Sequence, residues 1–297
     1  MIINQANLTL LTTGFRTAYR QAFSAATPQW NRVATLVNST TAAENYSWLG
    51  KFPQLREWIN ERVIQSLATY DYTIRNKDFE ATVAVPRNAI EDDQYGVFSP
   101  MMAEMGDAAA LHPDKIIFSL LKAGFSTPCF DGQAFFDADH PIGLPGKQTT
   151  VSNMQAGTGP AWFLLDTKRS LKPLVYQKRR PYDFIAKLDP RQSDHVFTQK
   201  EFIFGVDGRM NGGFGFWQMA AGSQAPLTPD NFRSLYQNMT TLKDDQGNPL
   251  GVKPNLLVVG PSNNFVARRI IEAQIVQATD NADLYKIVEI LDVPWLD

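Results

Sequence analysis

The residues best suited to chemistry lie in one short turn. Asp137, Asp139 and His140 occur in the string Phe-Phe-Asp-Ala-Asp-His-Pro. Two carboxylates and an imidazole are groups that a divalent metal accepts as ligands, so a metal-dependent reaction is one hypothesis for this turn. Carboxylates in turns more often accept hydrogen bonds from neighbouring backbone amides. We therefore favour a capping role and predict neither a metal site nor a cofactor.

Other catalytic patterns are missing from the sequence. Cys129 is the only cysteine and has no histidine close to it along the chain, so we expect a small buried thiol. The glycines at 212–215 lead into an aromatic strand, whereas a phosphate-binding glycine loop leads into a helix. No serine lies in a Gly-x-Ser-x-Gly turn. The sequence predicts no catalytic residues, which favours a structural role over an enzyme.

A dense basic stretch raises the question of nucleic-acid binding. No acidic residue lies between Asp166 and Asp183, and the basic residues there are Lys168, Arg169, Lys172, Lys178, Arg179 and Arg180. A patch that binds nucleic acid would be expected to interleave aromatic residues, and only Tyr176 and Tyr182 are available. We favour a solvated or acid-paired face. Pairing with carboxylates of a neighbouring subunit is a third hypothesis.

Composition limits the class of protein. The 297 residues include 28 Lys and Arg and 30 Asp and Glu, for a net charge of −2, so a dedicated nucleic-acid binder is disfavoured. With 44% hydrophobic and 11% aromatic residues the chain can bury a core, which excludes wholesale disorder and allows one large or two ordinary domains. No apolar run is long enough to span a bilayer, and the start does not resemble a signal peptide. A single cysteine excludes a disulfide framework.

The N-terminal segment is expected to pack against something else. Its first 43 residues contain three arginines but no Asp, Glu or Lys. Phe15, Tyr19 and Phe23 recur every fourth residue, which predicts a short amphipathic helix that begins after Thr13-Gly14 and ends at Pro28. A helix with one narrow apolar stripe packs either on its own domain or across a neighbouring subunit.

Residues 48–90 favour extended structure. Apolar and polar residues alternate over 70–75 and 79–85, and Pro86 ends the second run. The preceding stretch, 52–67, mixes apolar and charged residues. These features predict a long two-stranded hairpin with one solvent-exposed face. Because such a hairpin is marginally stable alone, its other face is expected to pack on a partner chain.

The rest of the chain predicts a mixture of helices and strands. Residues 91–124 read as a helix with acidic residues at its start and a Met-rich buried stripe, kinked or split at His112-Pro113. Loops are expected over 125–159, and a hairpin of strands 202–206 and 214–219. Thr228 should cap a helix, 256–259 form a buried strand, Ser262 open a helix that carries Phe265, and 286–291 form a last strand. The predicted fold class is α+β.

Specific strings connect the chain to a known family. Ala-Trp-Phe-Leu-Leu-Asp-Thr at 161–167, Phe-Gly-Val-Asp at 204–207 and Pro-Asn-Leu-Leu-Val-Val at 254–259 resemble blocks of the Mu-like phage major head subunit, gpT. Further matching blocks lie, in the same order as in the family, at 58–62, 72–74, 77–80, 90–93, 121–125, 137–141, 171–174, 177–179, 213–218 and 267–268. The resemblance extends from about residue 45 to the C-terminus.

The resemblance implies a Hong Kong 97-type capsid fold. Residues 1–47 would be the N-terminal arm and 48–82 the extended E-loop. Residues 83–297 would form the peripheral and axial domains, with the spine helix at about 91–124. The boundary between these two domains is left open.

Function is then implied to be assembly. Hexamers and pentamers of identical subunits would close into an icosahedral shell around double-stranded DNA, contacted without sequence specificity, and the protein would lie in the virion capsid after synthesis in the host cytoplasm. Expected partners are other copies, a separate scaffold and maturation protease, the portal, and a cement or decoration protein, but no membrane. The candidate intersubunit contacts are Arg56, Glu57, Trp58, Ile59, Arg62, Val63 and Ile64 of the E-loop, with Phe15, Tyr19 and Phe23 of the arm.

Two other functions compete with a capsid subunit. A nucleic-acid-binding head or scaffold protein would use residues 168–180 and bind DNA in a salt-sensitive way. A metal-dependent α+β enzyme would bind an ion at Asp137, Asp139 and His140 and form a small, fixed oligomer.

Overall fold

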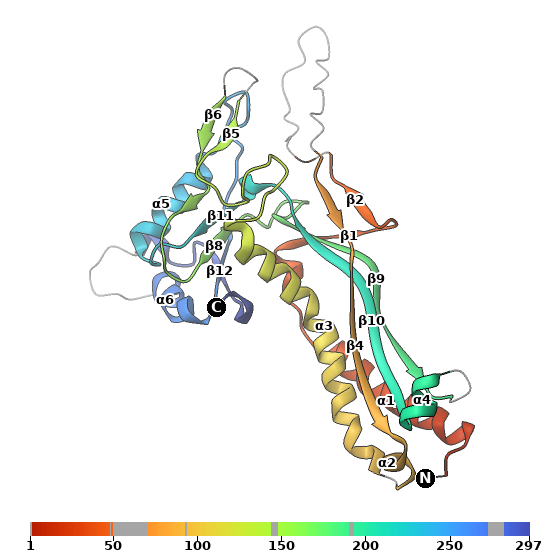
Figure 1. Cartoon of the computed structure of the whole chain (residues 1–297). Helices are drawn as coiled ribbons and strands as arrows, with labels where there is room; N and C mark the ends of the chain where they lie inside the picture. Colours follow the sequence, from red (N-terminus) through yellow and green to blue (C-terminus); the bar gives the residue numbers. More distant parts are fainter. Residues whose placement is uncertain are drawn as a thin grey trace.

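The chain folds into a broad body and a long peripheral region (Figure 1). The computed structural model describes residues 2–47, 49, 71–92, 94–143, 148–189, 193–272 and 282–297. The N-terminus lies at the far end of the peripheral region and the C-terminus in the body (Figure 1). The described elements combine helices with sheets in which most strand pairs are antiparallel, so the predicted α+β class is confirmed.

The peripheral region is built on a four-stranded sheet in the order β1-β9-β10-β4. Its strands are β1 (Ala34–Asn38), β9 (Leu174–Lys187), β10 (Glu201–Phe214) and β4 (Lys77–Pro86). β10 is antiparallel to β4 and β9, whereas β1 is parallel to β9. On β10 buried residues alternate with half-buried ones, so one face of the sheet is covered and the other is open.

The strand β10 corrects a sequence prediction. A hairpin was expected at 202–219, with its turn in the glycine-rich stretch after Val206, but Glu201–Phe214 is one continuous strand. Pairing with β4 on one side and β9 on the other holds it extended, and its register with β9 shifts between Asp207 and Met210. Its glycines permit close contacts instead of a turn: a Cβ at Gly208 would lie 3.0 Å from the Tyr182 ring.

Two helices cover the inner face of this sheet, α1 (Gln5–Ala25) and α3 (Ser99–Lys122). α1 begins at Asn4, whose side chain accepts a hydrogen bond from the Asn7 amide. It continues through Gly14, so the predicted start after that residue was wrong. The two helices approach closely at Gly106, where a Cβ would lie 2.3 Å from the Tyr19 carbonyl oxygen.

The spine helix also differs from its prediction. The expected helix 91–124 is divided into α2 (Arg87–Glu91), the 3₁₀ turn η2 (Gln94–Phe98) and α3, which contains Pro113 without being split. The first turn of α3 contains no acidic residue, although acidic residues were expected at the start of this helix. Glu91 instead ends α2, where it pairs with Arg87 at 2.9 Å. Met105 is buried as predicted, but Met101, which was expected in the same stripe, is exposed and Met102 is buried instead.

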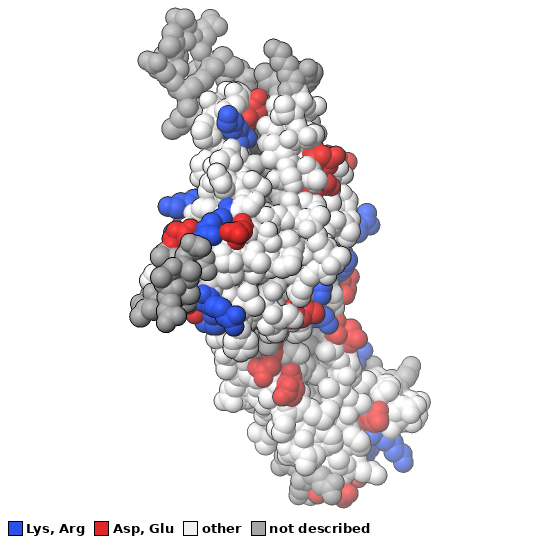
Figure 2. All heavy atoms as spheres, turned by 90° about the vertical axis from the view of Figure 1, so that its left-hand side faces the viewer, with Lys and Arg blue, Asp and Glu red and all other residues white. Residues whose placement is uncertain are grey.

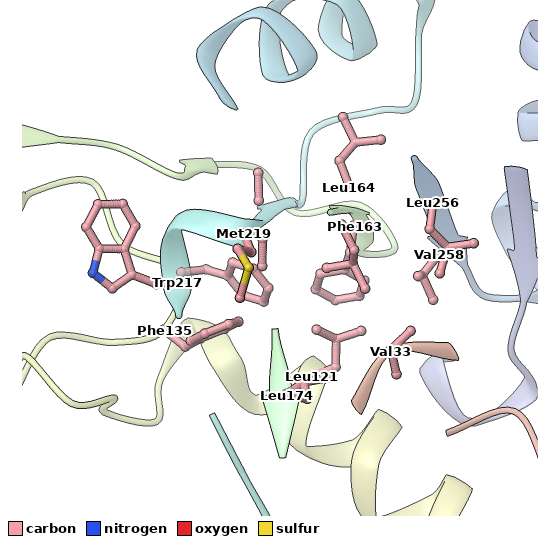
Figure 3. Packing of buried hydrophobic residues seen from close by; sticks show 14 of the residues in the cluster. Val33, Leu121, Phe135, Phe163, Leu164, Leu174, Trp217, Met219, Leu256 and Val258 are labelled. Carbon is pink, nitrogen blue, oxygen red and sulfur yellow. The ribbon is translucent and has the colours of Figure 1, made fainter. Parts of the chain in front are cut away.

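The body contains a five-stranded sheet in the order β13-β12-β8-β11-β7. Its strands are β7 (Met154–Gln155), β8 (Trp162–Leu165), β11 (Ala220–Ser223), β12 (Leu256–Val259) and β13 (Glu289–Asp292). Every residue of β8, β11 and β12 is buried. Figure 3 shows Phe163 and Leu164 of β8 packed beside Leu256 and Val258 of β12 in the core.

The helices α5 (Pro229–Thr240) and α6 (Pro261–Ile271) flank the body sheet (Figure 1). Thr228 caps α5 as predicted, by accepting a hydrogen bond from the Asn231 amide. The start of α6 was also predicted, but Phe265 on it is 79% exposed. None of the described helices has the length and apolar character needed to cross a membrane.

The smaller elements complete the chain. Two ribbons pair β2 (Ala43–Asn45) with β3 (Thr73–Arg75), and β5 (His140–Ile142) with β6 (Thr149–Val151). The remaining helical turns are η1 (Trp30–Arg32), η3 (Ala123–Phe125), α4 (Asp194–Gln199), η4 (Trp217–Met219), η5 (Ala282–Leu284) and η6 (Pro294–Leu296).

Candidate functional site

The turn that carries the candidate metal ligands is held by backbone contacts. The Asp137 carboxylate accepts hydrogen bonds from the amides of Ala134 at 3.3 Å and Ala138 at 2.6 Å. His140 contacts Asp131 instead of Asp137 or Asp139. The capping role favoured from the sequence is therefore the one that Asp137 performs.

His140 belongs to a buried cluster that includes Cys129 and Asp131. The Cys129 thiol donates a hydrogen bond to Asp131 Oδ1 at 3.1 Å, and His140 Nδ1 lies 2.8 Å from Asp131 Oδ2. The imidazole is fully buried and stacks on Trp217, with 4.0 Å between ring centroids. Asp131 was not recognised from the sequence, because only the turn at Gly132 brings its carboxylate between two residues that are eleven positions apart.

The order of groups in this cluster is unsuited to nucleophilic catalysis. A catalytic cysteine is commonly activated by an imidazole beside it, but here the carboxylate of Asp131 lies between the thiol and the imidazole and disfavours the thiolate. Burial, followed by the charge of Asp131, raises the pKa of the Cys129 thiol, which keeps it protonated at neutral pH. Burial alone would raise the pKa of Asp131, but hydrogen bonds from His140 and Cys129 hold that pKa below its usual value. The cluster joins the loop after α3 to β5.

The side chains of three of the six basic residues in the stretch 168–180 make polar contacts within the chain. Arg169 donates to Asp166 at 3.2 Å and to the Leu250 carbonyl at 2.7 Å. Lys172 bonds the Asn31 carbonyl, and Arg180 pairs with Asp207 across the sheet. On the face in Figure 2, basic and acidic side chains lie in small interspersed groups without a large basic area. The acid-paired interpretation therefore fits Arg169 and Arg180, whereas Lys172 bonds a backbone carbonyl.

The aromatic stripe of the N-terminal segment is divided between core and surface. Phe15 and Tyr19 are 1% and 4% exposed, and their rings lie 5.0 Å from Phe204 and 5.4 Å from Phe184 of the same chain. In this structure neither ring is available to a neighbouring subunit, because both rings pack against the peripheral sheet of their own chain. Phe23 is 38% exposed and keeps its place as a candidate contact.

The E-loop candidates lie outside the described residues. These are Arg56, Glu57, Trp58, Ile59, Arg62, Val63 and Ile64. The chain that leads into and out of this stretch is described, and it forms the β2–β3 ribbon. The last part of the expected E-loop, 77–82, belongs to β4 and pairs with β10, because its alternating residues find a partner strand in the same subunit.

Large apolar side chains are exposed at both ends of the molecule. Those of the peripheral region include Ile2, Leu10, Val97, Met101, Ile185 and Phe197, and those of the body include Phe265 and Trp295. Val97, Phe197 and Phe265 are each at least 68% exposed. The exposure of these side chains could not be predicted from the sequence, because periodicity identifies an apolar face without showing whether anything covers it.

Comparisons with known proteins agree on one family. Residues 8–296 match the family described as Mu-like prophage major head subunit gpT. The major capsid protein of Escherichia phage Mu is 39% identical over 93% of this chain and 92% of its own length. The Mu-like prophage FluMu major head subunit of Haemophilus influenzae is 39% identical over 88% of this chain and 87% of its own.

Solved structures give the same result. The chain resembles a subunit of the procapsid of bacteriophage JBD30 with a TM-score of 0.86 and 45% identity, over 99% of this chain and 100% of that one. It also resembles a subunit of the JBD30 capsid, with a TM-score of 0.79, 34% identity and full coverage of both chains. A third similar structure is the JBD30 capsid decorated with minor capsid protein trimers, with a TM-score of 0.77, 36% identity, and coverage of 94% and 93%.

Proposed function

This chain belongs to the family of Mu-like prophage major head subunits, gpT, and we propose that its copies assemble as hexamers and pentamers into an icosahedral shell around double-stranded DNA. It is a major capsid protein, a structural component of the phage head, and not an enzyme. Its fold is the α+β Hong Kong 97-type fold of phage major capsid proteins.

The similarity to the procapsid subunit is the observation that carries the proposal. It extends over 99% of this chain at a TM-score of 0.86, so the peripheral region, the ribbon and the body all have counterparts there. A shell-forming subunit also needs surfaces that remain uncovered until copies meet. The open face of the peripheral sheet and the exposed Val97, Phe197 and Phe265 are such surfaces.

Parts of the chain are proposed to act as in the family. In this assignment α3 is the spine helix, the four-stranded sheet with α1 and α3 is the peripheral domain, and the five-stranded sheet with α5 and α6 is the axial domain. The segment between Leu49 and Asp71 is the E-loop, shorter at its end than the predicted 48–82. The N-terminal arm is residues 1–47, with α1 docked on its own subunit.

Contacts between subunits are proposed to centre on the E-loop. Trp58, Ile59, Val63 and Ile64 would bury apolar area on an adjacent copy, and Arg56, Glu57 and Arg62 would set the register. Obligate interfaces commonly bury about 2,000 Å² or more, which a long loop can help to supply. Phe23 is a further candidate contact from α1.

Further partners are proposed on the strength of the family. They are a scaffold, a maturation protease, the portal and a minor capsid protein that decorates the shell. The decorated JBD30 capsid supports the last of these. DNA inside the shell would be contacted without sequence specificity, in line with the interspersed surface charges and the net charge of −2.

Assembly is tested by expressing the chain, with its scaffold where one is identified, and imaging it by negative-stain electron microscopy with light scattering. Hexamers, pentamers, tubes or closed shells are expected. A monomer or dimer that never assembles would contradict the proposal.

Deleting residues 52–68 tests the E-loop separately. We expect a folded subunit, with an unchanged far-UV spectrum for the rest of the chain, that no longer forms shells. Normal shells from this variant would remove the E-loop from the assembly mechanism.

A further inference from the structure

The β2–β3 ribbon is attached to the subunit in an unusual way. Strand β4 leaves the ladder with β10 at Lys77, which is opposite Met210, and after a gap at Asn76 the chain pairs only with β2. Among the described residues the ribbon shares no strand pairing with the peripheral sheet. Two strands of three residues each are marginally stable alone, so side-chain contacts must hold the ribbon in place.

The first of these contacts is apolar: one side chain (the knob) fills the space that a glycine leaves by having no side chain (the hole). Ile74 of β3 is 4% exposed and packs against the bare backbone of Gly213 on β10. A Cβ at Gly213 would lie 2.0 Å from Ile74 Cδ1 and 2.5 Å from Cγ1. Real Cβ atoms essentially never approach other atoms so closely, so a larger residue at 213 would force the Ile74 side chain to move from this position.

Two hydrogen bonds flank the knob. The Tyr72 hydroxyl accepts a hydrogen bond from the Phe214 amide at 2.8 Å, and the Asn211 side chain donates to the Arg75 carbonyl at 2.7 Å. Side chains thus replace the backbone ladder beyond Lys77. Because each bond has a fixed direction, the pair defines an angle between ribbon and sheet as well as a distance.

A buried polar network fixes the other side of the ribbon. Gln177 of β9 is fully buried and donates to the Ile74 carbonyl at 3.0 Å and to Asn76 Oδ1 at 2.9 Å. Its own oxygen accepts a hydrogen bond from the Tyr46 hydroxyl at 2.8 Å. Asn76 in turn donates to Ser39 Oγ at 2.8 Å. Such a satisfied network favours one arrangement, because any other leaves buried polar groups without partners.

The geometry points to a joint, formed by Ile74, Gly213, Tyr72, Asn211 and Gln177, that fixes the direction in which the chain enters and leaves the segment between Leu49 and Asp71. This inference rests on the proposed role of that segment in contacts between subunits. The joint is a set of positioning residues, because it sets the angle at which each copy presents its loop, and hence the curvature of the shell.

Four variants test the joint. Gly213→Ala blocks the hole and Ile74→Ala removes the knob, whereas the double variant restores room for the new methyl group. Gly14→Ala on α1 is the matched control, because a Cβ there meets nothing within 4 Å. If Gly213→Ala fails to fold, Asn211→Ala removes the hydrogen bond to the Arg75 carbonyl, together with the one that Asn211 Oδ1 accepts from the Gly212 amide. This variant should act in the same direction to a smaller extent.

The first measurement is the orientation of the ribbon in isolated subunits. Spin labels at Thr73→Cys on β3 and Ala84→Cys on β4 report the distance between ribbon and sheet, and the native Cys129 is buried and unique. We expect a broad distance distribution in each single joint variant, and a narrow one in the double variant and in Gly14→Ala. Equally narrow distributions in all variants would overturn the joint.

The second measurement is the shape of the assembled particles, imaged without labels. Single joint variants should give tubes, open sheets or shells of mixed size, and the double variant should regain more uniform shells. A loosened ribbon with shells of normal size would overturn the role of the joint in curvature. If the unsubstituted chain does not assemble, the proposed function fails, and the distance measurement still decides whether the joint holds the ribbon.

Discussion

The body and the peripheral region bury their residues in different ways. In the body, strands β8, β11 and β12 are covered on both faces, and Trp162, Phe163 and Leu164 are fully buried. In the peripheral region a smaller cluster lies between α1, α3 and one face of the sheet, while Ile203 and Ile185 lie on the other, open face. The body is therefore stable through its own packing, whereas the peripheral region keeps a surface that another copy can cover.

The largest expected effect is in the body. Phe163 is fully buried and packs against Phe136, with 5.2 Å between ring centroids. Phe163→Ala should lower the free energy of unfolding by about 3–5 kcal/mol, measured by urea titration of the isolated subunit. Phe197→Ala is the matched control, since that ring is 73% exposed and should change stability by less than about 0.5 kcal/mol. A small loss for Phe163→Ala would show that the body is not the stable region.

The next effect should be confined to the peripheral region. Phe15 joins α1 to the sheet through Phe204, so Phe15→Ala should cost about 3 kcal/mol and release α1 before the body unfolds. Amide hydrogen exchange measures this as faster exchange in α1 with little change in β8 and β12. Phe23→Ala, at a half-exposed ring, should have a smaller effect. If α1 and β12 lose protection together, the two regions form one cooperative unit and the comparison fails.

What could be predicted from the sequence also differs between the two regions. Local signals identified several elements of the body, where Thr228 caps α5 and the apolar run at 256–259 is the buried strand β12. They did not identify the short strands β5, β6 and β7, which lie in the stretch 125–159 that was predicted as loops. In the peripheral region the same kinds of signal misled, because long-range pairing decided the outcome. The glycines of β10 predicted a turn, but pairing with β4 and β9 keeps that strand extended and uses Gly213 to admit Ile74.

The candidate sites follow the same pattern. Asp137 caps its turn, as its local context indicated. Asp131 and Gln177 were missed because their partners are distant in sequence or lie on another element: His140 for Asp131, and Tyr46, Ile74 and Asn76 for Gln177. Burial of Phe15 was predictable from periodicity, but the choice between its own sheet and a neighbouring subunit was not.

Two helix N-caps, one in each region, test the comparison of body and peripheral region with a smaller expected change in stability. Thr228 in the body and Asn4 in the peripheral region each accept a hydrogen bond from a backbone amide of their own helix. Thr228→Ala and Asn4→Ala should each cost about 1 kcal/mol locally. In urea titrations of the whole subunit we expect the Thr228 variant to show that loss and the Asn4 variant to show less, because α1 can fray without unfolding the body. Equal losses would argue against independent fraying of α1.

The smallest expected effect is a dependence on pH at the ribbon. Glu44 accepts hydrogen bonds from the Ser39 hydroxyl and from the amides of Thr40 and Thr41, and these lower its pKa from 4.5 to about 2. A carboxyl group with a lowered pKa contributes stability that is fully present above its ordinary pKa and is lost as the pH falls towards the folded value. Protection of the Thr40 and Thr41 amides, relative to an unfolded peptide, should therefore decrease between about pH 4.5 and pH 2 while that of β12 stays constant.

A carboxyl resonance of Glu44 that titrates near 4.5 in the folded subunit would contradict this prediction. Glu44→Gln supplies the control, because its amide oxygen can still accept hydrogen bonds but does not titrate over this range. In that variant the ribbon should show a weaker but pH-independent protection. Acid would then loosen the ribbon of the unsubstituted chain while leaving the body folded, which is the behaviour expected if hydrogen bonds of individual side chains hold the ribbon and apolar burial holds the body.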